Sequence, residues 1–195
     1  MKILVVSLLR LGDILLSTAV LRSIKRENPN ADLHILINKQ FESVAQMIPY
    51  VDKVHTFDRV GLQEIIGRPE RNLLEAYYGV EDLVESLREE NFDTVLNLTH
   101  NRLSGWLVSL VGCGNTRGVA VRQDGKFALG SSWFEYLNQI TDSSTKNSFH
   151  FVDVFHYGAG LVNIDRRIEL KENVKGIEFA EMAFGGSLAR KKVLV

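Results

Sequence analysis

The feature that most constrains the fold is an alternation of short apolar runs with longer segments of helical periodicity. Residues 3–6 form a continuous apolar run, which is typical of a strand buried on both faces of a parallel sheet. Further strands are predicted, in chain order, over residues 33–37, 54–57, 93–98 and 116–119, and helices over residues 16–24, 41–48, 73–87, 103–111, 149–161 and 178–190. Strands that alternate with helices favour right-handed βαβ crossovers. We therefore predict an α/β fold, a Rossmann-like parallel sheet with helices on both faces.

Two internal stretches lack either pattern. Residues 58–70 contain Gly61, Gly67 and Pro69 without clear periodicity, which predicts a long surface loop, and residues 120–148 are turn-rich and polar. The chain has 195 residues, more than a typical single domain and fewer than two. Because residues 191–195 resemble the opening of a buried strand, we expect one domain over residues 1–190 and, at 191–195, the start of a second domain that is absent.

Charge and cysteine content exclude several functional classes. A formal net charge of -1 gives no global basic field that would attract nucleic acid, so we expect no nucleic-acid partner. The single cysteine, Cys113, excludes a disulfide framework and suits a reducing compartment. Arg10 and Asp13 interrupt the first apolar stretch, which argues against a signal peptide or a membrane span. We expect a cytoplasmic protein.

The first candidate site follows the first predicted strand, where the sequence continues Arg10-Leu11-Gly12-Asp13. In an open parallel sheet the ligand crevice lies at the carboxyl ends of the strands. Gly12 permits a tight turn there, and Asp13 either caps the helix that follows or acts as a general base, two roles that are compatible. The carboxylate disfavours a phosphate at this helix start, and neither G-x-G-x-x-G nor Walker A sequences follow the strand, so no cofactor is predicted.

A second candidate site follows the strand at 93–98 and gathers His100, Asn101, Arg102 and Ser104. These side chains could donate hydrogen bonds to a polyhydroxylated or phosphorylated acceptor. With equal weight, Asn101 or Ser104 could simply cap the next helix.

Two histidines and a carboxylate, His150, Asp153 and His156, share a predicted helix and raise the question of a metal site. Their spacing spreads them over about 120° of the helix surface. No Asp-x-Asp sequence accompanies them. We therefore favour a solvated or acceptor-facing helix and predict no metal.

Several segments together resemble glycosyltransferase family 9, the ADP-heptose:lipopolysaccharide heptosyltransferase family. The segments that carry the resemblance are residues 1–6, 11–18, 21–22 and 29–31, then Pro49-Tyr50-Val51-Asp52-Lys53-Val54, Arg117-Gly118 and His150-Phe151-Val152-Asp153, with Asn101 and Ser104 at polar positions of the family. The chain departs from the family pattern at Asn97, where many relatives carry Asp. The resemblance spans nearly all of the chain.

The resemblance implies a GT-B architecture, in which two Rossmann-like domains face a cleft and this chain supplies the N-terminal, acceptor-side domain. Asp13 would be the catalytic base, and Gly12, Ser17, Thr18, His100, Asn101, Arg102 and Ser104 would bind substrate. The implied reaction is inverting transfer of heptose from ADP-heptose to a lipopolysaccharide inner-core acceptor, without a metal. The implied setting is the cytoplasm, with peripheral contact at the cytoplasmic face of the inner membrane.

Two rival hypotheses stay open. In one, the chain is a non-catalytic module that binds a saccharide or partner through the same crevice. In the other, it is a metal-dependent enzyme that uses His150, Asp153 and His156.

Overall fold

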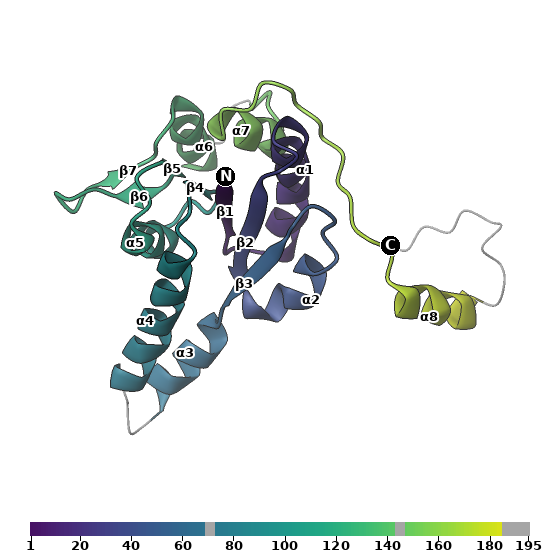
Figure 1. Ribbon diagram of the computed structural model, residues 1–195, viewed down its shortest axis with the longest axis horizontal. Coiled ribbons are helices and arrows are strands. Elements are labelled where there is room, and N and C mark those ends of the chain that lie inside the picture. Colours follow the sequence, from purple (N-terminus) through teal and green to yellow (C-terminus); the bar gives the residue numbers. More distant parts are fainter. Residues whose placement is uncertain (69–72, 143–146, 185–195) are drawn as a thin grey trace.

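Five parallel strands form the central sheet, in the spatial order β3-β2-β1-β4-β5 (Figure 1). The computed structural model describes residues 1–68, 73–142 and 147–184. The strands are β1 (Lys2–Ser7), β2 (Asp32–Asn38), β3 (Lys53–Phe57), β4 (Thr94–Asn97) and β5 (Thr116–Gly118). β1 lies at the centre, hydrogen-bonded in parallel register to β2 on one side and to β4 on the other. The predicted α/β fold and all five predicted strands are confirmed.

Helices cover both faces of this sheet. In chain order they are α1 (Leu11–Glu27), α2 (Glu42–Ala45) after a 3-10 turn (Lys39–Phe41), α3 (Arg59–Gly67), α4 (Leu73–Glu89), α5 (Arg102–Val111), α6 (Ser132–Asp142), α7 (Phe151–Gly158) and α8 (Val174–Phe184). The helices predicted over 73–87, 103–111 and 149–161 are confirmed by α4, α5 and α7.

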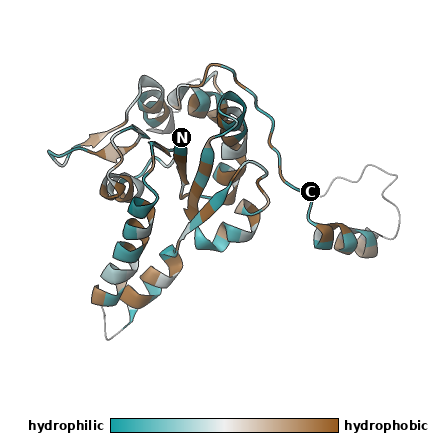
Figure 2. Cartoon of the chain, in the orientation of Figure 1, coloured by the Kyte–Doolittle hydropathy of each residue, from teal (hydrophilic) through white to brown (hydrophobic). Residues whose placement is uncertain are grey.

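The strands separate two apolar cores, as alternate residues of a strand point to opposite faces. One core packs Ile3 and Val5 of β1 against α1, α2, α6 and α7, and the other packs Leu4 and Val6 against α4 and α5. All four of these β1 side chains are buried, because the strand is covered on both faces. Figure 2 shows the same concentration of apolar residues along the strands.

Two sequence-based predictions of irregular structure were wrong. Residues 59–67 form helix α3 rather than a loop, capped by the Asp58 side chain, which accepts a hydrogen bond from the Gly61 N–H at 2.9 Å. A Cβ on Gly61 would lie 3.0 Å from that carboxylate, so the glycine makes room for the cap instead of breaking the helix. Residues 120–148 also contain regular structure, a short hairpin of β6 (Ala120–Val121) and β7 (Phe127–Ala128) followed by α6.

An extended segment after α7 runs along the helices beside the sheet. Asp165 pairs with Arg22 of α1 at 2.9 Å, the Tyr50 hydroxyl donates to Glu169 at 2.5 Å, and the Lys171 N–H donates to the Met47 carbonyl at 2.6 Å. The segment leads to α8, which lies apart from the sheet in Figure 1.

The structure covers only part of the elements predicted at the end of the chain. α8 begins at Val174, four residues before the helix predicted over 178–190. The strand predicted at 191–195, and with it the start of a second domain, lies outside the described residues. Within the residues that the structure describes, no helix is long and apolar enough to cross a membrane.

Close packing of α6 against α7 at Gly158 generates a stability prediction. A Cβ on Gly158 would lie closer than 3.0 Å to the buried ring of Phe134, whereas a Cβ on Gly79 of α4 would make an ordinary contact with Leu62 at 3.5 Å. We expect Gly158→Ala to lower the free energy of unfolding by about 1–3 kcal/mol through overpacking. Gly79→Ala should be neutral or stabilising by up to about 1 kcal/mol, because alanine favours a helix more than glycine does. Urea denaturation measures both, and equal effects would contradict the packing argument.

Candidate functional site

The crevice expected in a parallel sheet lies where the strand order reverses. From β1 the chain proceeds outward through β2 and β3, and then returns to the other side of β1 with β4 and β5. The carboxyl ends of β1 and β4 are therefore the topological switch point, which is the usual ligand site of such sheets. Asp13 follows β1, and His100, Asn101 and Arg102 follow β4, so the two candidate sites predicted from the sequence lie on adjacent loops.

Asp13 lies in the first turn of α1 with one carboxylate oxygen uncommitted. The helix begins at Leu11, with Arg10 as its N-cap residue, so Asp13 occupies the third helical position and is not the N-cap. Its Oδ2 accepts a hydrogen bond from the Arg10 N–H at 3.0 Å. Within the described part of the chain, Oδ1 accepts none, and the side chain is half-buried. The carboxylate thus stabilises the helix start and keeps one oxygen without a partner among the described residues.

Gly12 has a different role from the one predicted. It lies inside the first helical turn and does not have a positive φ, so no tight turn requires it. Apart from its two chain neighbours and the backbone of its own helix, no atom lies within 4 Å of the position where a Cβ would stand, and the residue is exposed. The missing side chain leaves open space directly beside Asp13.

Two buried side chains that the sequence analysis did not single out hold the loop after β1. The Thr99 hydroxyl oxygen accepts a hydrogen bond from the Leu8 N–H at 2.7 Å, which joins the loops after β1 and β4. From the other side, the Asn38 Nδ2 donates to the carbonyls of Leu8 and Leu9 at 2.8 and 3.2 Å. Asn38 ends β2, and Thr99 comes after β4. This place at the carboxyl end of a strand is the only sequence signal that could have identified them.

Asn97, the departure from the family pattern, forms the base of the loop after β4. Its Nδ2 donates to the Ser104 hydroxyl at 3.1 Å and to the Val119 carbonyl at 2.8 Å, and its Oδ1 accepts from the Thr99 N–H at 2.9 Å. The side chain is fully buried, so the arrangement needs both the donor and the acceptor of a neutral amide.

Asn101 takes the capping role that was weighed against substrate binding, and Ser104 supplies the N–H that is capped. Asn101 is the N-cap of α5, and its Oδ1 accepts from the Ser104 N–H at 2.8 Å. The Ser104 side chain is fully buried, and its hydroxyl donates to the Thr99 carbonyl at 2.6 Å. Ser104 is therefore a buried residue that stabilises the loop after β4.

His100 and Arg102 belong to the same segment but differ in exposure, with His100 largely buried and Arg102 exposed. His100 contacts the Phe134 ring, and its Nδ1 lies 3.2 Å from the Asn138 Oδ1. Burial lowers the pKa of His100, partly offset by that hydrogen bond, and its Nε2 has no partner within the described residues. The exposed Arg102 guanidinium lies 5.7 Å from the centre of the Phe127 ring.

Ser17 and Thr18 lie away from the crevice surface. Both side chains are fully buried in α1, and their hydroxyls donate to the carbonyls of Ile14 and Leu15 at 2.7 Å each. Thr18 also accepts a 3.4 Å hydrogen bond from the backbone of Glu169 in the extended segment. This geometry gives them a structural role, and we do not include them in the site.

A pocket of about 520 Å³ opens at the carboxyl ends of β2 and β3. Its lining includes Leu9, Asn38, Lys39, Phe57, Asp58 and Arg59. Lys39 pairs with Asp58 at 2.7 Å, and this hydrogen bond, with that from the Gly61 N–H, lowers the pKa of Asp58. Through Leu9, the pocket adjoins the loop between β1 and α1. It extends the candidate site toward β3 at the edge of the sheet.

The three residues weighed as a metal set do not converge on a common point. His150 is the N-cap of α7 and accepts from the Val152 N–H, while His156 is fully buried between Ser23 and the Val152 carbonyl. Asp153 receives two 2.7 Å hydrogen bonds from Arg166. Burial raises the pKa of Asp153, but the bonds from Arg166 and the His150 N–H outweigh it and lower that pKa. The hypothesis of a metal-dependent enzyme built on these residues is therefore contradicted. Among the described residues, the one group placed to share a metal is His34 on β2, His55 on β3 and Glu90 after α4.

Comparison with known proteins identifies the fold. No protein-family model matches the sequence, and no curated protein matches it in sequence. Among solved structures, the glycosyl transferase family 9 protein of Veillonella parvula superposes with a TM-score of 0.66 at 16% identity, over 97% of this chain and 50% of that one. E. coli ADP-heptose lps heptosyltransferase II gives a TM-score of 0.60 at 16% identity, over 94% and 50%. E. coli heptosyltransferase WaaC, solved with ADP-2-deoxy-2-fluoro heptose, gives 0.61 at 14% identity, over 87% and 51%.

The fold of this chain is thus that of glycosyltransferases of the GT-B type, and the structural resemblance to family 9 and heptosyltransferases is confirmed. The chain spans about half the length of these structures.

The amide of Asn97 generates a prediction with a matched control. Asn97→Asp would place a carboxylate against the Val119 carbonyl and remove both donated hydrogen bonds. We expect the free energy of unfolding to fall by about 2–4 kcal/mol, because the charge is buried without a donor partner. Asn101→Asp keeps the one acceptor that its cap needs and should change stability by less than about 0.5 kcal/mol. Comparable losses in urea denaturation would show that amide donation at Asn97 does not matter.

The ion pair of Asp153 with Arg166 generates a pH prediction. The Asp153 side chain is 3% exposed, so Arg166→Gln should lower the free energy of unfolding at pH 7 by about 1–3 kcal/mol. Since the folded-state pKa is lowered, the pair stabilises the fold above the unfolded pKa of about 3.8, and this stability is lost as the pH falls through the folded value. The difference between variant and wild type should therefore shrink below about pH 4. Arg167→Gln, at an exposed residue nearby, is the control, and a pH-independent difference would refute the assignment.

Proposed function

We propose that this chain is the acceptor-side half of a glycosyltransferase and that Asp13 is its catalytic base. The observation that carries the proposal is the carboxylate of Asp13, which presents an uncommitted oxygen at the switch point of a glycosyltransferase fold. Open space over Gly12 would let an acceptor sugar approach this oxygen closely. In such a complex the acceptor hydroxyl donates its hydrogen bond to Oδ1.

The proposed reaction is inverting transfer. Asp13 takes the proton of the acceptor hydroxyl as that oxygen attacks the anomeric carbon of a nucleotide-activated sugar, and the nucleoside diphosphate leaves from the opposite face. The Arg10 N–H and the α1 helix start keep the carboxylate oriented throughout. Heptose from ADP-heptose is the donor we propose, because two of the similar structures are heptosyltransferases and one of them was solved with an ADP-heptose analogue. The donor would be held by a second half, since this chain spans about half the length of the similar structures.

The charges at this edge favour an anionic acceptor. The segments after the first four strands carry Arg10, Lys39, Arg59 and Arg102, and because Lys39 is paired with Asp58, the three arginines supply the positive charge available to an acceptor. Lys39 and Arg59 line the 520 Å³ pocket, which is large enough for sugar residues on either side of the reacting one. A lipopolysaccharide inner core fits this requirement, and we propose it as the acceptor. Work on such a lipid would take place at the cytoplasmic face of the inner membrane.

His100, Asn101 and Arg102 would bind the acceptor from the other side of Asp13. Arg102 offers an exposed guanidinium, whereas the unpartnered His100 Nε2 is buried and would meet an acceptor only if its side chain turned. Asn101 already caps α5 through Oδ1, so its amide nitrogen is the group available for a sugar hydroxyl.

Asp13→Asn tests the assignment, because the amide can still accept the Arg10 N–H but cannot take a proton. Transfer from ADP-heptose to an inner-core acceptor is measured with the chain alone and with a heptosyltransferase donor-binding half supplied. We expect no turnover by the chain alone, and with the second half a loss of at least about 100-fold in kcat for Asp13→Asn. Acceptor affinity, measured by calorimetry, should stay within about threefold, because binding does not require the proton transfer.

Asp82→Asn, at an exposed carboxylate on α4, is the control and should leave transfer unchanged. If Asp13→Asn keeps full activity, Asp13 is not the base. If the wild-type chain binds the acceptor but never supports transfer, the chain is a non-catalytic saccharide-binding module.

A further inference from the structure

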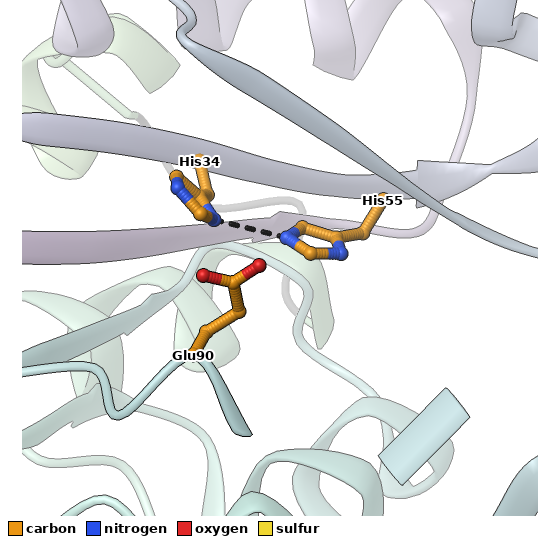
Figure 3. Close-up of side chains that lie close together, drawn as sticks. All are labelled: His34, His55 and Glu90. Atoms are coloured by element: carbon orange, nitrogen blue, oxygen red, sulfur yellow. Dashed lines mark hydrogen bonds between the residues drawn. The ribbon is translucent and has the colours of Figure 1, made fainter. Parts of the chain in front are cut away.

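On the face of the sheet that α4 and α5 cover, two histidines and a carboxylate face one another (Figure 3). His34 is on β2, His55 is on β3, and Glu90 directly follows α4. The His34 Nδ1 and the His55 Nε2 are 3.0 Å apart, and one ligand atom from each residue lies within 4.8 Å of the other two. Ligand atoms of a tetrahedral zinc ion, at bond lengths of about 2.0–2.1 Å, are about 3.3 Å apart. The two nitrogens are therefore spaced almost as a bound ion would space them.

The tautomer of His34 is set by Asp32. The Asp32 Oδ1 lies 3.1 Å from the His34 Nε2, and because a carboxylate only accepts, this nitrogen carries the proton. The lone pair of a neutral His34 then lies on Nδ1 and points at His55. A carboxylate on the outer nitrogen is the arrangement that orients histidine ligands in metal sites. A metal ion would displace the proton that the two inner nitrogens share and would lie to one side of the line that joins them, since zinc–nitrogen bonds are about 2.0–2.1 Å long.

The cluster is shielded from water. His34 is 1% exposed and His55 is 8% exposed. The Phe92 ring packs edge-on against both imidazoles, with centroid distances of 5.2 and 6.2 Å. Shielding of this kind limits competition from water for the ligand positions.

Two lysines now neutralise the third ligand. Lys2 donates to the Glu90 Oε2 at 2.6 Å, and Lys53 pairs with the Oε1. The Lys53 side chain is 55% exposed and can turn into solvent, whereas Lys2 is held further by Asp32 at 3.7 Å. An incoming cation would therefore displace Lys53 and bind the oxygen that it leaves.

We propose that His34, His55 and Glu90 form a binding site for a divalent transition metal ion, with zinc as the expected occupant. Two imidazoles and one carboxylate are ligands that zinc binds, and three protein ligands leave one position for water. The ion would connect β2, β3 and the end of α4. This inference does not depend on the proposed function, since the cluster shares no hydrogen bond or ion pair with Asp13.

The alternative is a metal-free network of hydrogen bonds and ion pairs with the same residues. Glu90→Gln and Lys53→Gln separate the two, because each breaks the Glu90–Lys53 ion pair. Under the alternative, both affect stability in the same direction and neither creates or removes zinc binding. Under the proposal, Glu90→Gln removes a ligand, while Lys53→Gln removes the cation that competes with zinc.

The experiment is a zinc titration of chelator-stripped protein by calorimetry, with cobalt absorption as a second readout. We expect one ion per chain, a Kd below about 1 µM and a rise in Tm on zinc addition. Glu90→Gln and His55→Gln should each weaken binding by at least about tenfold, and Lys53→Gln should strengthen it several-fold. His150→Asn keeps a residue that caps α7 well and leaves the cluster intact, so it should bind zinc as the wild type does.

Absence of stoichiometric binding, or equal affinity in wild type and Glu90→Gln, would overturn the proposal. If His55→Gln fails to fold by circular dichroism, the opposed effects of Glu90→Gln and Lys53→Gln carry the test. Zinc affinities of those two variants that shift in the same direction would also overturn it.

Discussion

The junction of β1 with β4 is the constraint on which the rest of the molecule depends. β1 is buried on both faces and hydrogen-bonded on both sides, so its carboxyl end cannot move independently of its neighbours. Thr99 continues this connection beyond the sheet by accepting the Leu8 N–H, and the Leu98 N–H donates to the Val6 carbonyl at 3.0 Å. The loop that leads to Asp13 thus has a fixed starting point, and the position of the helix start and its carboxylate follows from it.

The contrast between Asp13 and Asp153 shows how the surroundings decide what a carboxylate can do. Both lie at the third position of a helix, and both accept the N–H of the N-cap residue at 3.0 Å. Asp153 is buried and bound twice by Arg166, so its lone pairs are used to join the extended segment to α7. Asp13 is half-buried and keeps one oxygen without a partner among the described residues. The same local motif is structural in one place and available for chemistry in the other.

Errors in the sequence-based interpretation have identifiable physical causes. The sequence predicts a loop in place of helix α3 because Gly61 and Gly67 disfavour a helix. Asp58, three residues before Gly61, is the signal of a helix cap at this point. Ser17 and Thr18 were assigned to substrate because they belong to the segment that resembles the family, but their side chains face the core. Asn38 and Thr99 could not be identified from the sequence, because a single polar residue at a strand end has no distinctive local pattern.

The sequence by itself determined the sheet, its parallel strands and the edge at which a site would lie, because apolar periodicity and strand–helix alternation are local properties that survive in the linear order. It also placed Asp13 at the start of a helix beside that edge. Only the tertiary structure decided which polar side chains face the crevice and which support it, since burial depends on elements distant in the chain. For the same reason, only the fold brought His34, His55 and Glu90 together from two strands and a helix end.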